Sequence, residues 1–169
     1  MTYTCSSCGK EHEDLPAIAF DAAYYYYDLS DEEKENITEL STDFCIIKGE
    51  DQTDRFIRAV LFQPVKDHTD TLQYGVWVSL SEKSFNDYKA NFHNNEHEAT
   101  YFGFMANYVP GYDSTLSLHT DVILSKGGSR PEVIPHTSDH PFVQDYYNGI
   151  SIEEAERRVR ETVERKVES

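Results

Sequence analysis

Three stretches rich in β-branched and aromatic residues constrain the fold of this chain more than any other feature. They span residues 44–47, 55–62 and 74–80, and their composition is typical of β-strands. The polar connectors at 49–54 and 64–71 are too short to hold the helical crossover that joins parallel strands. We therefore expect these strands to pair as antiparallel neighbours.

Further strands are expected on the C-terminal side of this region. Residues 100–109 and 115–124 flank a Pro-Gly turn, and residues 130–135 form a proline-containing extended piece that fits a sheet edge. The expected fold class is α+β, with an antiparallel sheet of about five or six strands and helices packed on one face. Trp77 is expected to be buried in a central strand beside residues 56–62.

Two helices are expected between the strands. Ser30 and Glu33 form a capping box, which is the pattern that begins a helix, ahead of an amphipathic segment at 31–40. Residues 82–92 carry aromatic side chains at helical spacing and end at the cluster His93-Asn94-Asn95.

The clearest helical signal lies at the C-terminus. Ser151 and Glu154 form a second capping box. Small apolar residues then recur on one stripe, at Ala155, Val159, Val163 and Val167. We therefore divide the chain into a single α+β domain at 1–150 and a charged C-terminal helix at 151–169.

The charge of the chain excludes several classes of partner. Over 169 residues, 31 acidic side chains against 15 lysines and arginines give a net charge of −16, which repels nucleic-acid phosphates and anionic lipid surfaces. No apolar run is long enough to span a bilayer, and the N-terminus lacks the regions of a signal peptide. We expect a soluble cytoplasmic protein whose cysteines are reduced thiols or metal ligands.

Two cysteines near the N-terminus have the spacing of a zinc knuckle. In Cys5-Ser6-Ser7-Cys8-Gly9, both thiolates can face one tetrahedral centre. His12 follows closely, and Cys45 begins an apolar strand. We therefore predict one structural zinc ion held by Cys5, Cys8, His12 and Cys45, so that the domain at 1–150 begins with a segment resembling a zinc knuckle.

Two alternatives to this zinc site remain open. His136 or His140 can replace one ligand, although their H-x-x-x-H spacing suits one helical face only if Pro141 does not interrupt the helix. The other alternative is a pair of reduced thiols near the N-terminus, with Cys45 as an ordinary core residue.

Short motifs in a fixed order resemble a family of bacterial proteins. In chain order they are C-x-x-C-G at 5–9, Leu15-Pro16, Asp43-Phe44-Cys45, Phe56-Ile57-Arg58, Gly75-Val76-Trp77-Val78-Ser79, Tyr101-Phe102-Gly103, Arg130-Pro131 and Asp139-His140-Pro141. Together they resemble the family catalogued as domain of unknown function 2199, over most of the chain. The family carries no established activity, so the resemblance implies a compact bacterial module and transfers no catalytic residue.

Histidines and aspartates in the C-terminal half are the remaining candidates for chemistry. His119, Asp121 and Asp113, with Asp139 and His140, can be interpreted as an acid–base or metal-binding cluster. The more common role of such residues beside proline is to cap a helix or to form a turn. Nucleophile-elbow, nucleotide-binding and metalloprotease motifs are absent from the sequence, so no enzyme class is supported.

Two arginines are expected to form internal ion pairs. Arg58 and Arg130 lie in apolar or strand-like surroundings, where a buried guanidinium requires a carboxylate partner. Asp43 and Glu132 are the expected partners.

Two functions are compatible with these features. The first is a non-enzymatic binding module that presents an acidic, tyrosine-rich face to a basic protein partner, with zinc serving only to hold the N-terminus. The second is a small metal-dependent enzyme that joins the cysteines to His140. The net charge of −16 without a catalytic motif favours the first.

Overall fold

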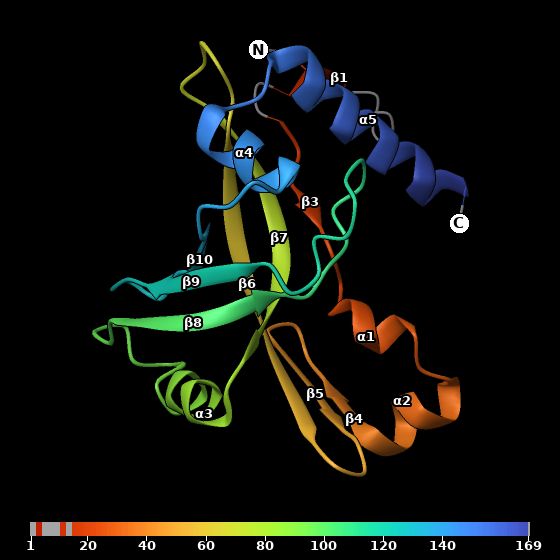
Figure 1. The fold of residues 1–169 in the computed structure, drawn as a ribbon, viewed down its shortest axis with the longest axis vertical. Coiled ribbons are helices and arrows are strands. Elements are labelled where there is room, and N and C mark those ends of the chain that lie inside the picture. Colours follow the sequence, from red (N-terminus) through yellow and green to blue (C-terminus); the bar gives the residue numbers. More distant parts are fainter. Residues whose placement is uncertain (1–2, 5–10, 13–14, 169) are drawn as a thin grey trace. The chain divides into compact units, whose positions relative to one another are not determined.

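The computed structural model describes residues 3–4, 11–12 and 15–168 (Figure 1). In chain order the elements are β1 (Tyr3–Thr4), β2 (Glu11–His12), β3 (Ile18–Ala19), α1 (Tyr24–Tyr27), α2 (Asp31–Ile37), β4 (Thr38–Leu40), β5 (Phe44–Lys48), β6 (Thr53–Pro64), β7 (Thr71–Leu80), α3 (Glu82–Ala90), β8 (Ala99–Met105), β9 (His119–Leu124), β10 (Glu132–Pro135), α4 (Pro141–Asn148) and α5 (Ile152–Glu168). No helix among the described residues is long and apolar enough to cross a lipid bilayer.

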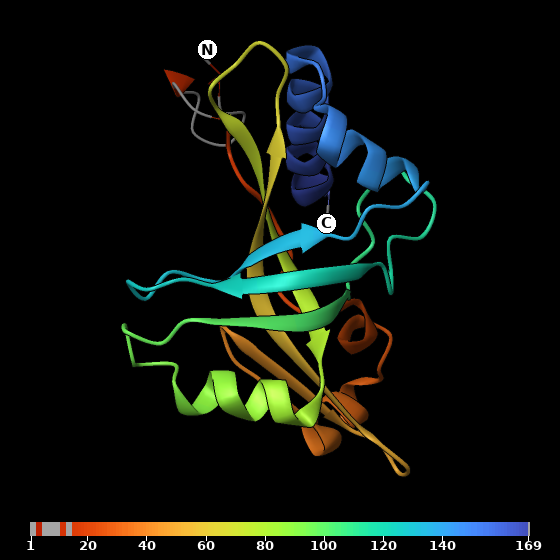
Figure 2. The same cartoon turned by 60° about the vertical axis from the view of Figure 1, so that its left-hand side comes forward.

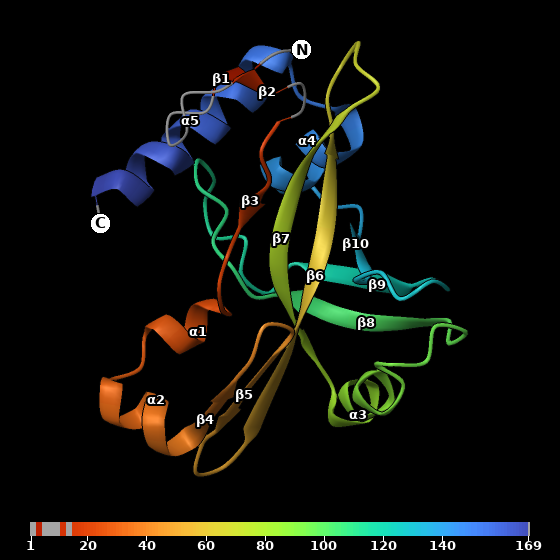
Figure 3. The same cartoon turned by 180° about the vertical axis from the view of Figure 1, so that it is seen from behind.

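The chain divides into two compact units. Unit 1 contains residues 1–19, 62–74 and 137–169, and unit 2 contains residues 20–61 and 75–136. Strands β6 and β7 each contribute residues to both units. The two strands pair with each other (Figure 3). That the chain folds as a single domain up to residue 150 stays a prediction.

Five strands close into a barrel, most of which lies in unit 2 (Figure 2). β7 pairs with β8, β8 with β9, and β9 with β10, and all three pairs are antiparallel. β10 then pairs in parallel with β6, where Glu132 lies opposite Val60, and the pairing of β6 with β7 closes the ring. β5 and β4 extend the sheet from β6 as further antiparallel strands.

This closure corrects the expected sheet. The α+β class and the antiparallel pairing of chain neighbours are confirmed, but the strands do not form one open antiparallel sheet. Local composition indicates which residues form strands, whereas closure depends on the twist of the sheet and on the pairing of two strands that lie far apart in the sequence.

The helix expected at 31–40 is shorter than predicted. Its capping box is confirmed, because Ser30 Oγ accepts a hydrogen bond from Glu33 N at 3.1 Å and Glu33 Oε1 accepts one from Ser30 N at 3.2 Å. The helix ends at Ile37 because Thr38–Leu40 pair with β5 as strand β4. The helix expected at 82–92 is α3, whereas α1 and α4 have no counterpart in the sequence prediction.

Trp77 lies at the centre of an apolar cluster in unit 2. Its side chain is completely buried and packs with Ala23, Cys45, Phe56 and Ala106. The predicted burial of Trp77 beside the β6 strand is therefore confirmed.

The predicted C-terminal helix is α5, which packs within unit 1. Ala155 and Val159 are buried, in agreement with the apolar stripe. Arg158 is also buried: its Nε donates to Glu154 Oε1 at 2.8 Å and its Nη1 donates to the Tyr74 hydroxyl at 3.1 Å. A guanidinium therefore links the helix to the start of β7.

Candidate functional site

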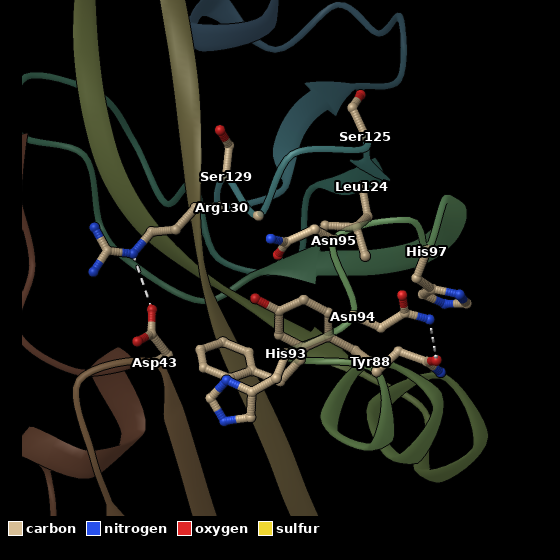
Figure 4. A pocket seen from close by; sticks show the side chains of 13 residues that line it. Asp43, Tyr88, His93, Asn94, Asn95, His97, Leu124, Ser125, Ser129 and Arg130 are labelled. Atoms are coloured by element: carbon tan, nitrogen blue, oxygen red, sulfur yellow. Dashed lines mark hydrogen bonds and ion pairs between the residues drawn. The ribbon is translucent and has the colours of Figure 1, made fainter.

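A polar pocket of about 580 Å³ opens in unit 2 (Figure 4). Its walls come from α3, the loop after α3, the turn between β9 and β10, and the residue just before β5. The lining includes three asparagines, two histidines, two serines and one arginine. The volume falls within the range of small-molecule sites, but the lining is more polar than is usual for them.

Two loops meet along one wall of this polar pocket. The backbone N–H of Gly127 donates to the carbonyl oxygen of Asn95 at 2.9 Å. Gly128 has a φ of +75°, and a Cβ atom added there would lie 2.7 Å from Asn95 Oδ1. Glycine at position 128 therefore allows both the left-handed backbone and the close approach of the loops.

An ion pair forms another side of the pocket. Arg130 Nε donates to Asp43 Oδ1 at 2.9 Å, which confirms the predicted carboxylate partner of Arg130, but the Arg130 side chain is 41% exposed, so the pair is not internal as expected. The corresponding expectation for Arg58 is not met among the described residues, where its Nε atom is buried without a hydrogen-bond partner.

Tyr88 reaches the pocket from α3. Only 3% of the residue is exposed, and its ring contacts the rings of Phe44 and Phe92. Burial, reinforced by the negative charge of Asp43, raises the pKa of the Tyr88 phenol to about 12. The hydroxyl is therefore a neutral donor and acceptor at physiological pH, although no described side chain or backbone group bonds to it.

A shared carboxylate positions His97 at the pocket wall. Asp87 Oδ2 accepts a hydrogen bond from the Tyr101 hydroxyl at 2.8 Å and lies 2.9 Å from His97 Nε2. These two hydrogen bonds lower the pKa of the Asp87 carboxyl, whereas burial and the Asp87 contact raise the pKa of the Tyr101 phenol. The arrangement fixes the orientation of the imidazole ring.

Aromatic side chains gather on the outer surface of the barrel. We define the aromatic face as Phe102, Phe104, His119, Asp121 and His136. The Phe102 and Phe104 rings lie 5.0 Å apart, and each lies within 5.5 Å of the His119 ring. His136 Nε2 lies 2.8 Å from Asp121 Oδ1. Phe102 is 47% exposed and Phe104 is 37% exposed.

A second pocket, of about 220 Å³, adjoins this face. It is lined by the rings of Tyr25, Phe56 and Phe104, and we call it the aromatic pocket. Tyr25 stacks on Phe56 with ring centres 5.8 Å apart. Asp54 supplies the one formally charged side chain among the lining residues.

One known protein family matches most of the chain. A family model described as an uncharacterized protein conserved in bacteria, DUF2199, matches residues 4–150. The chain belongs to this family. The resemblance seen in the sequence motifs is therefore confirmed, and both pockets and the aromatic face lie inside the span shared with DUF2199. No curated protein and no solved structure matches the chain.

The predicted zinc ligands stay a prediction for this DUF2199 member. Cys5 and Cys8 lie outside the described residues, as does the side chain of His12. Cys45 is buried in the cluster around Trp77, and burial raises the pKa of its thiol to about 11. Within the described part of the chain, no group of three or more His, Cys, Asp or Glu side chains is arranged to hold a metal ion.

The histidines singled out from the sequence have separate surroundings. His119, Asp121 and His136 come together on the aromatic face. His140 caps α4 instead, because its Nδ1 accepts a hydrogen bond from Phe142 N at 3.1 Å. This is the capping role that the proline after His140 favoured. Asp113 and Asp139 are exposed.

The sequence did not indicate either pocket. The sequence of the run His93-Asn94-Asn95 indicates only the end of a helix, yet the run supplies part of the polar pocket. Strict alternation along β8 was the signal available for the aromatic face, since Phe102 and Phe104 occupy alternate positions and must share one side of the strand.

Proposed function

We propose that this DUF2199 member is a non-enzymatic binding module that receives a basic protein partner on its aromatic face. The supporting observation is the exposure of Phe102 and Phe104, which contact each other in an edge-to-face arrangement on the outside of β8. Aromatic residues are enriched in protein interfaces, and contiguous apolar patches on a protein surface mark interaction sites.

The charge of the face indicates the charge of the partner. Asp121 lies opposite Phe102 on β9, and Asp54 lines the adjoining aromatic pocket. Neither the aromatic face nor the lining of the aromatic pocket contains a lysine or an arginine. With a net charge of −16 on the chain, a lysine- or arginine-rich surface is attracted and correctly oriented during encounter.

The aromatic pocket supplies an anchor for one basic side chain. A lysine or arginine that enters it meets the rings of Tyr25, Phe56 and Phe104, and its charge reaches Asp54. Cation–π attraction contributes about 0.5–2 kcal/mol, depending on how far the cation is desolvated. Aromatic anchors of this kind dominate the binding energy of many interfaces.

The proposal is tested by affinity purification from the native cytoplasm with the wild-type chain and with the double variant Phe102→Ala/Phe104→Ala. At low ionic strength we expect the wild type to retain a basic protein, and we expect high salt to release it. The double variant should lose that protein. Tyr27→Ala is the matched control, since Tyr27 is 49% exposed but lies outside the face.

The affinity of the purified partner for the wild type and for the double variant is then measured directly, to test whether the aromatic face is the interface. An affinity that is unchanged in the double variant places the interface elsewhere. Recovery of only the wild-type chain at low salt, or of an acidic partner, contradicts the proposed function. Equal melting temperatures of the variants and the wild type ensure that lost binding does not reflect unfolding.

A further inference from the structure

The polar pocket is lined by Tyr88, whose hydroxyl lacks a partner among the described residues. Tyr88 is 3% exposed, and its hydroxyl has no hydrogen-bond partner in the described part of the chain. A ligand in the pocket can therefore form a hydrogen bond with Tyr88.

Other polar groups face the same space. In Figure 4 the Tyr88 hydroxyl and the Asn95 side-chain amide both point toward the side of the pocket that holds Asp43 and Arg130. His93 adds an imidazole ring below them, in edge contact with Phe92. The pocket thus presents donors and acceptors together, beside the aromatic rings of Tyr88 and Phe92.

The charges of the lining determine the charge of the ligand. Asp43 and Arg130 carry the formal charges among the lining residues at neutral histidine, and they pair with each other. An ion that entered would be desolvated without a net opposite charge to compensate it. An anion would in addition approach a chain whose net charge is −16.

We propose that the polar pocket binds a small neutral molecule that carries several hydroxyl groups, of the chemical class of the free sugars. A hydroxyl both donates and accepts hydrogen bonds, so it can satisfy an amide, a phenol and a carboxylate in turn. The apolar side of a sugar ring can pack against the aromatic rings of the lining. The volume of about 580 Å³ accommodates a ligand of this size.

The test uses probes that share one ring and differ in charge: glucose, glucuronate and glucosamine, together with the neutral sugars galactose, mannose and N-acetylglucosamine. Each is titrated into the isotopically labelled full chain while backbone amide resonances are recorded. We expect at least one neutral sugar to shift resonances of residues 91–97 and 125–130, and we expect the charged relatives to bind more weakly.

Two variants assign the binding to the pocket. Tyr88→Phe keeps the ring but removes the hydroxyl, and it should weaken binding of the neutral sugar by about fivefold, the loss of one hydrogen bond. Tyr27→Phe, which removes an exposed hydroxyl outside the pocket, should leave the affinity unchanged.

Three results overturn the proposal. They are the absence of pocket shifts with every neutral sugar, tighter binding of glucuronate or glucosamine than of glucose, and an affinity in Tyr88→Phe equal to that of the wild type.

Discussion

The indole nitrogen of Trp77 donates a hydrogen bond to the carbonyl oxygen of Phe20 at 2.9 Å. The backbone N–H of Trp77 also donates to Asn107 Oδ1 at 2.7 Å, and Asn107 Nδ2 donates to the carbonyl oxygen of Ala22. One buried residue on β7 therefore fills the core of unit 2 and fixes the segment that leads into α1.

Replacement of Trp77 by alanine should destabilise the protein by about 3–5 kcal/mol, because it leaves a cavity and an unsatisfied carbonyl group. Trp77→Phe should retain part of this stability, since a ring still fills most of the space. Urea unfolding followed by circular dichroism measures both effects. Phe102→Ala, which truncates an exposed ring, is the control, and an unchanged midpoint for Trp77→Ala would contradict the burial.

Gly103 on β8 allows the neighbouring strands β7 and β9 to lie close to its backbone. A Cβ atom at this position would lie 3.0 Å from the carbonyl oxygen of Ser79 and 3.2 Å from Val122 Cγ2. We expect Gly103→Ala to cost about 1–3 kcal/mol, because the backbone must shift to relieve the overlap. Thermal melting should show this loss as a lower melting temperature. Thr100→Ala, at an exposed position of the same strand, should have the melting temperature of the wild type.

The Asp87 carboxylate should make stability depend on pH. Its folded-state pKa is lowered by the hydrogen bonds from Tyr101 and His97. The stabilisation is therefore fully present above the unfolded pKa of about 3.9 and is lost as the pH falls through the lower folded value. Because the side chain is 46% exposed, we expect only about 1 kcal/mol.

Denaturation curves of the wild type and of Asp87→Asn between neutral and acidic pH measure this contribution. The difference between the two proteins should be constant at neutral pH and should shrink in acid. A difference that grows in acid would reverse the sign of the linkage.

Arg158 should contribute more to stability than its neighbour Arg157, although both bond to Glu154. The side chain of Arg158 is 7% exposed and also reaches Tyr74, whereas that of Arg157 is 45% exposed. We expect Arg158→Ala to cost about 3 kcal/mol and Arg157→Ala about 0.5 kcal/mol. Equal losses in parallel unfolding experiments would show that burial of the guanidinium has no effect.

The zinc prediction is tested by elemental analysis of the purified chain. About one zinc ion per chain is expected, and Cys8→Ser should abolish binding. The predicted tetrad also requires Cys45→Ala to release zinc. Full zinc content in Cys45→Ala, together with reduced stability, would assign Cys45 to the core around Trp77 and leave its place as a ligand to another residue.

Sequence alone was sufficient for the elements whose signals are local. The capping box at Ser30 and Glu33 depends on residues three positions apart, and the strands β5 to β10 are rich in residues that favour extended backbone. The burial of Trp77 followed from its size and its place in an apolar strand. A carboxylate partner for Arg130 was also expected from the sequence, with Asp43 and Glu132 as the candidates, although the guanidinium is 41% exposed rather than buried.

Only the tertiary structure decided how these elements close and what they bring together. The parallel contact of Glu132 with Val60 turns a sheet into a barrel, and no local pattern encodes a pairing between strands so distant in sequence. That closure places Asp43, Tyr88 and Arg130 around one pocket, although they come from three separate parts of the chain. Each residue has an ordinary local role, so the pocket arises from long-range packing, which residue types and their spacing do not specify.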